Sequence, residues 1–168
     1  VIKKPVLGVS NDGKKAIGVN FTRLENALPG FGYVGEKVNS GQSTVAYPDN
    51  DGLFLIDLES GKSKLVVTLA DVKKIAPPPS YLEGPLMWFH HAHFNPNDSR
   101  VFFVAKTRQK GKPMASAAIT MNPDGSDLFL NIPYEWDATH YDWFDNKKMV
   151  VTSAYKKKQR SLLMFTDK

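Results

Sequence analysis

Three segments of the chain repeat one pattern, in which a short strand, a polar turn and a second strand follow one another. They read LGVSNDGKKAIGV from Leu7, AHFNPNDSRVFFV from Ala92 and YDWFDNKKMVVT from Tyr141. The first two align without a gap, and the third is one residue shorter in the turn. Such internal repetition is typical of proteins built from similar supersecondary units. The sequence therefore predicts one β-module that recurs along the chain.

The apolar residues come in short segments rich in Val, Ile, Phe and Leu, separated by Asn, Asp, Gly, Pro and Lys. This pattern predicts strands and turns, with almost no helical periodicity. The expected strands are residues 6–10, 16–20, 53–58, 65–69, 91–94, 101–106, 117–121, 128–132, 139–143, 149–154 and 162–166. One short helix is expected at residues 69–75, because three consecutive prolines follow it.

The second half of the module also recurs, as LFLIDLESGKSKLVVTL from Leu53 and AAITMNPDGSDLFLNIP from Ala117. A full module is then four antiparallel strands, which favours an all-β fold and a segment of a β-propeller. We expect one blade over residues 1–79 with a long inserted loop at 21–47, a second over 80–135 and an incomplete third over 136–168. These make up about two and three-quarter blades, and closed propellers have about four to eight. The missing blades are expected from a longer chain or from another copy or chain.

The amino-acid composition excludes several kinds of functional site. The 168 residues include no Cys, which excludes disulfides, thiolate zinc sites and a cysteine nucleophile. The compartment stays open between periplasm and cytoplasm. No apolar stretch approaches the roughly 20 residues that span a bilayer, so we expect no membrane insertion. The net charge of +5 selects no particular polyanion, and the densest basic run, residues 155–160, is interpreted as a hairpin turn rather than a nucleic-acid site.

The turns FNPNDSRVFF and ITMNPDGSDLFL resemble the repeats of TolB-like propellers. A longer stretch, residues 7–151, resembles bacterial propeller proteins related to oligogalacturonate lyases, through GKKAIGVNFTRL, PGFGYVG, HHAHFNPNDSRVFF and THYDWFDN. This resemblance implies a seven-bladed propeller that cleaves galacturonate oligomers by β-elimination. It also implies a divalent metal, usually manganese, held by several His and a Gln near the central channel.

All four histidines lie in or just before the first strand of the second and third modules. His91 aligns with His140, because each precedes the aromatic residue of its strand by three positions. Side chains alternate along a strand, so we expect His91 and His93 to share one face and His140 to share a face with Asp142. Three imidazoles and a carboxylate suit Mn²⁺ or Zn²⁺, which predicts a metal site at His91, His93 and His140.

Other roles for these histidines stay open. His91 and His140 could act as catalytic acid and base, or they could bind an anionic or sugar ligand without a metal. They could also form hydrogen bonds with backbone carbonyls or waters in a polar channel.

The inserted loop offers substrate-binding candidates. Arg23 could pair bidentately with a carboxylate, and Tyr33 could stack on a sugar ring, with Asp142 as a further contact. The alternative is that the loop aromatics pack the loop onto its own blade. The leading hypothesis is a bacterial carbohydrate-active or sugar-binding propeller, a lyase of acidic oligosaccharides. The alternative is a non-catalytic TolB-like scaffold for protein partners.

Overall fold

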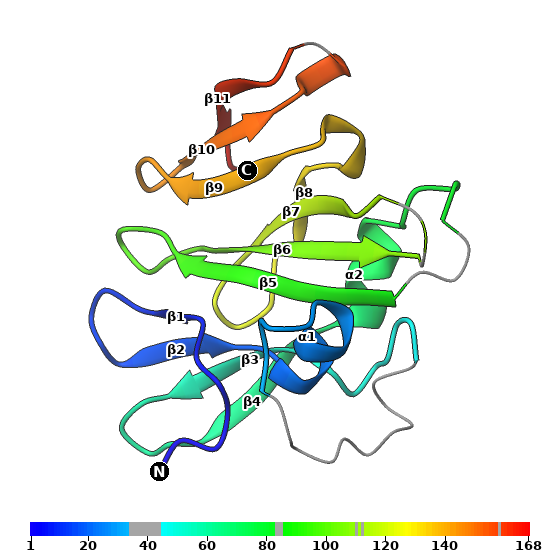
Figure 1. The fold of residues 1–168 in the computed structure, drawn as a ribbon. Coiled ribbons are helices and arrows are strands. Elements are labelled where there is room, and N and C mark those ends of the chain that lie inside the picture. Colours follow the sequence, from blue (N-terminus) through cyan, green and yellow to red (C-terminus); the bar gives the residue numbers. More distant parts are fainter. Residues whose placement is uncertain (34–44, 83–85, 110, 112, 158) are drawn as a thin grey trace.

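The described residues form three antiparallel β-sheets that follow one another in chain order (Figure 1). The computed structural model describes residues 1–33, 45–82, 86–109, 111, 113–157 and 159–168. Two of these sheets have four strands and the third has three. The expected mostly-β architecture is therefore confirmed.

Each sheet is built from strands that are consecutive in the sequence. The first contains β1 (Gly8–Val9), β2 (Lys15–Gly18), β3 (Gly52–Asp57) and β4 (Ser63–Thr68). The second contains β5 (Leu86–Phe94), β6 (Val101–Arg108), β7 (Ala115–Met121) and β8 (Phe129–Ile132). The third contains β9 (Thr139–Trp143), β10 (Lys148–Ser153) and β11 (Ser161–Thr166). Every expected strand is present, although β5 begins five residues before the expected position at His91.

Two α-helices lie within the described residues. Helix α2 (Leu69–Ile75) matches the prediction, and a capping box begins it, since Thr68 Oγ1 accepts the Asp71 N–H at 3.0 Å. Helix α1 (Phe21–Ala27) occupies part of the segment expected to be a loop, so that prediction was wrong there. Asn20 caps α1 by accepting two backbone N–H groups through Oδ1. Single turns of 3-10 helix, η1 (Tyr134–Trp136) and η2 (Tyr155–Lys157), lie in connections, and η2 confirms the turn expected in the basic run.

The turns of the repeat close with equivalent hydrogen bonds. Ser10 N donates to Lys15 O at 2.9 Å, and Asn95 N donates to Arg100 O at 2.8 Å. The third turn closes one residue earlier, from Phe144 N to the carbonyl of Lys148 at 2.8 Å. The alignment read from the sequence therefore describes a real structural equivalence.

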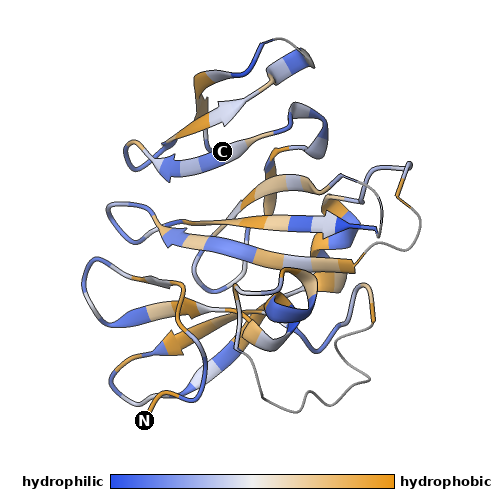
Figure 2. Cartoon of the chain, in the orientation of Figure 1, coloured by the Kyte–Doolittle hydropathy of each residue, from blue (hydrophilic) through white to orange (hydrophobic). Residues whose placement is uncertain are grey.

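Apolar side chains fill the space between successive sheets. Figure 2 shows hydrophobic residues on the strands of the first and second sheets and hydrophilic residues in the turns. Ile17 of the first sheet belongs to one buried cluster with Phe103 of the second. Phe102, on the opposite face of β6, belongs to another cluster with Met149 and Val151 of the third sheet. The second sheet is thus covered on both faces.

Polar contacts between turns fix the sheets relative to one another. The Asp98 carboxylate accepts the backbone N–H groups of Asn11 at 2.7 Å and Asp12 at 3.0 Å, which joins the first sheet to the second. Asn95 Nδ2 donates to Asn146 O at 2.9 Å and joins the second sheet to the third. Buried Asp167, just beyond β11, receives the Arg100 Nε–H at 2.8 Å.

We expect Gly125→Ala to destabilise the contact between the first and second sheets. Gly125 has φ 90°, and a Cβ there would collide with the backbone carbonyl of Val66. Gly13 provides a matched control, because its φ is 69° but a Cβ would meet no atom within 4 Å. Gly13→Ala should cost about 1 kcal/mol from backbone strain alone. Gly125→Ala should cost a further ~1–3 kcal/mol from overpacking, measured by urea denaturation. Equal costs would contradict the close approach.

Candidate functional site

His91 and His140 occupy the same irregularity in the first strands of their sheets. In β5 the pairing with β6 shifts between His90 and His93, and in β9 the pairing with β10 skips His140. Both histidines have positive φ, 47° for His91 and 53° for His140. A β-bulge inserts one extra residue and redirects its side chain. The equivalence predicted from the sequence therefore extends to a shared backbone conformation.

A pocket of about 600 Å³ lies where the second and third sheets meet. It brings together three of the predicted site residues, His91, His140 and Asp142. The remaining lining residues are Lys106, Ser116, Thr139, Tyr141 and Val150. The β-bulges thus place two imidazoles from neighbouring sheets on one cavity, as the repeat alignment suggested.

Each of the two bulge histidines is in contact with the side chain of the residue that precedes it in the sequence. His90 Nδ1 lies 2.5 Å from His91 Nδ1, and Thr139 Oγ1 lies 3.0 Å from His140 Nδ1. Burial lowers the pKa of both His90 and His91 to about 4, although part of His91 remains exposed to solvent. The positive charge of Lys106 makes a smaller contribution to the same lowering of both pKa values. Both imidazoles are neutral at pH 7, so one Nδ1 donates a proton to the other.

His93 lies outside this pocket. Its ring stacks on Phe102 with centroids 5.4 Å apart and an interplanar angle of 11°. The expectation that His91 and His93 share a face assumed regular alternation, which the bulge at His91 interrupts. Among the described residues, no group of three or more His, Asp or Glu side chains could hold a metal ion. The three predicted metal ligands, His91, His93 and His140, therefore do not form a fitting donor set.

Arg23 is a buried structural residue and not an exposed side chain that could pair with a substrate carboxylate. It is 2% exposed, and Nε donates to Met87 O at 2.7 Å. Nη2 donates to the carbonyls of Val45 at 2.6 Å and Ala46 at 2.9 Å. Burial lowers the pKa of the guanidinium, and nearby Asp51 partly offsets this effect. These contacts tie α1 to β5 and to the chain before β3, so a substrate carboxylate has no open access to this side chain.

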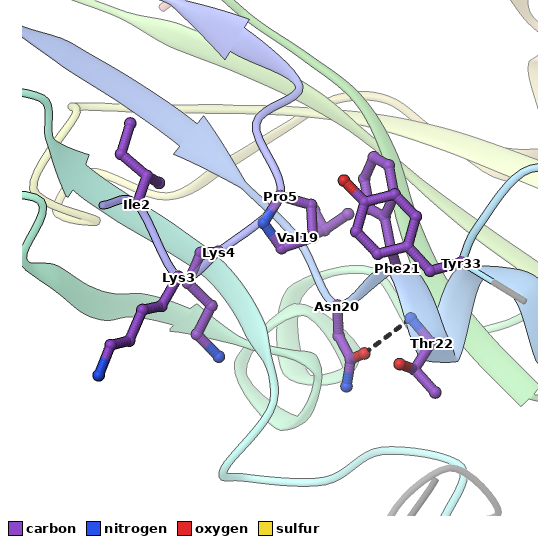
Figure 3. Close-up of a pocket in the computed structure, with 9 residues that line it drawn as sticks. All are labelled: Ile2, Lys3, Lys4, Pro5, Val19, Asn20, Phe21, Thr22 and Tyr33. Atoms are coloured by element: carbon purple, nitrogen blue, oxygen red, sulfur yellow. Dashed lines mark hydrogen bonds between the residues drawn. The ribbon is translucent and has the colours of Figure 1, made fainter. Parts of the chain in front are cut away.

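Tyr33 lines a different and smaller pocket, of about 270 Å³, beside the start of α1 (Figure 3). Its ring lies 5.0 Å from that of Phe21, and the side chain is 52% exposed. Lys3 and Lys4 approach the same pocket from the N-terminal segment. The two pockets share no lining residue, so Tyr33 does not join His91 and His140. Residues 34–44 of the predicted loop lie outside the described residues.

Sequence reasoning missed Lys106. This half-buried side chain lines the pocket of His91 and His140, and burial lowers its pKa. Its signal in the sequence is a single charge directly after the apolar run VFFVA. Since charged residues are rarely buried without a partner, a lysine interrupting such a strand is a candidate for a functional role.

Comparison with known proteins finds no matching family model and no similar curated protein. Within the described part of the chain, no helix is both long and apolar enough to cross a membrane.

Proposed function

We propose that the three sheets are successive blades of a β-propeller, and that the pocket between the second and third binds and cleaves an acidic oligosaccharide. The repeated turns and the two equivalent bulges support the propeller. On the third sheet, Thr152 corresponds to Val104, which the second sheet buries against its neighbour. The β11 residues Leu162 and Met164 stay 71% and 50% exposed. A further blade, from a longer chain or another copy, would cover them.

The paired bulge histidines are the observation on which the cleavage activity rests. In β-elimination, a base removes the proton on the carbon next to the uronate carboxylate. The electron pair forms a carbon–carbon double bond, and the glycosidic oxygen leaves from the adjacent carbon. Neutral His91 can accept the proton at Nε2 when its Nδ1 donates to His90. His140, on the facing sheet, then supplies a proton to the departing oxygen.

No step of this mechanism is assigned to a metal, because the described residues offer no set of three ligands. The resemblance to metal-dependent lyases still makes Mn²⁺ and Zn²⁺ the ions to test.

The experiment is turnover of oligogalacturonate by the full chain, followed through the absorbance of the unsaturated product. Assays run after extensive dialysis and again with added Mn²⁺ or Zn²⁺. We expect His91→Ala and His140→Ala to lower kcat/KM by about 100-fold or more, as for removal of a general acid or base. His93→Ala is the matched control and should retain activity, since His93 lies outside the pocket.

Absence of unsaturated product under all three metal conditions would refute the lyase proposal. If oligogalacturonate binding is also unchanged in both pocket variants, the non-catalytic scaffold for protein partners becomes the better interpretation.

A further inference from the structure

Lys106 differs from two other cations of this chain, which are well paired. Arg100 contacts Asp127 at 3.0 Å and Asp167 at 2.8 Å, and Arg23 donates to several backbone carbonyls. Lys106 pairs through its backbone with Trp88 and Ser116, but its ammonium has no hydrogen bond or ion pair with any described residue. Its ammonium is half-buried at the wall of the pocket between the second and third sheets. The ammonium of Lys106 therefore has no direct counter-ion among the described residues.

Leaving an ammonium partly buried without a partner is unfavourable, because its lost hydration is not replaced. An anion that enters the pocket would replace that hydration with a charge-assisted hydrogen bond. His91, which lines the same pocket, is neutral at pH 7 and does not compete for the anion. Lys106 is thus the strongest anion-binding group among the lining residues.

Asp142 limits which anions can bind. It lines the same pocket from the third sheet, and its Oδ1 accepts the Trp143 N–H at 2.8 Å. Within the described chain, Oδ2 has no hydrogen-bond donor, and no ion pair joins Asp142 to Lys106. A carboxylate accepts hydrogen bonds from ligand hydroxyl groups but repels a second negative charge. The wall bearing Asp142 therefore favours neutral hydroxyl donors.

We propose that Lys106 binds a single carboxylate of the ligand while Asp142 accepts hydrogen bonds from its hydroxyl groups. The ligand class is a monocarboxylate with several hydroxyl groups, such as a uronate unit. The assignment rests on the proposed function for the site, but its recognition step does not require cleavage.

Calorimetric titration of the full chain with galacturonate, galactose and inorganic phosphate tests this assignment. Galacturonate should bind at least about 10-fold more tightly than galactose, as expected for one charge-assisted hydrogen bond. Lys106→Met should remove that preference and leave galactose binding unchanged, and Lys106→Arg should restore most of it. Lys147→Met, in the exposed turn before β10, is the matched control. Asp142→Asn should strengthen phosphate binding.

Several results would overturn the assignment. One is wild-type protein that binds galacturonate no better than galactose, and another is tighter binding of phosphate than of galacturonate. A third is undiminished galacturonate affinity in Lys106→Met. The lyase proposal and the Lys106 assignment can also be refuted independently of each other. Lys106-dependent binding without unsaturated product removes the lyase and keeps this inference, whereas turnover with unchanged KM in Lys106→Met does the reverse.

Discussion

Replacing Arg23 by alanine is expected to lower the free energy of unfolding by about 3–5 kcal/mol, the usual cost of breaking a buried, charged network. The substitution removes donors from the carbonyls of Met87, Val45 and Ala46. It also leaves the buried carboxylate of Asp51, 4.0 Å from the guanidinium, without its nearest positive charge. Urea denaturation followed by far-UV circular dichroism measures this loss.

Arg160→Ala is the control for removing an arginine from the surface. Arg160 pairs with Asp137 but is 41% exposed, so its loss should cost less than about 1 kcal/mol. If Arg23→Ala instead retained full stability and lost affinity for oligogalacturonate, the role predicted from the sequence would be correct and the structural role wrong.

Phe102→Ala is expected to cost about 3–5 kcal/mol, as for other fully buried aromatic residues. The side chain has no exposed surface and joins the second sheet to the third. Its ring lies 5.4 Å from His93, 5.9 Å from Trp143 and 6.3 Å from Tyr141, measured between centroids. Because the same two sheets form the walls of the pocket, ligand binding should weaken along with the fold.

Phe144→Ala is the control that tests whether burial of the ring, and not its hydrophobicity alone, causes this loss. Phe144 is also a phenylalanine, but it lies in the turn before β10 at 61% exposure, so its truncation should change the free energy of unfolding by less than about 0.5 kcal/mol. Comparable losses in the two variants, measured by urea denaturation of the same chain, would show that Phe102 is not a central packing residue between the sheets.

The repeated strands and turns were predictable because their causes are local. The turn between β5 and β6 closes on itself from Asn95 to Arg100, within a few residues that the sequence shows directly. The same holds for α2, whose cap and terminating prolines are adjacent in the chain. Alternation and turn residues therefore predicted the strand order, and the alignment of His91 with His140 followed from the repeat.

The predicted site was less accurate because long-range contacts and backbone irregularities decide it. Arg23 was expected to face a ligand, but its partner Met87 lies 64 residues away in sequence, where composition gives no signal. The metal hypothesis depended on strict alternation from His91 to His93, which one inserted residue disrupts. Lys106 was overlooked because the residues before it in β6, VFFVA, have the pattern of an ordinary buried strand.

The β-bulge that β5 and β9 share sets the backbone conformation from which a side chain leaves the strand, and the residue type at the bulge sets its chemistry. The first module has Val6 at the aligned position, but Val6 lies before β1 and has no positive φ, so the bulge belongs to the second and third modules. The two modules that share the bulge present the same residue type, histidine, from the same backbone conformation. A change of side chain at either bulge would therefore alter the group that lines the pocket, while the turn after each strand would still close through its own backbone hydrogen bond.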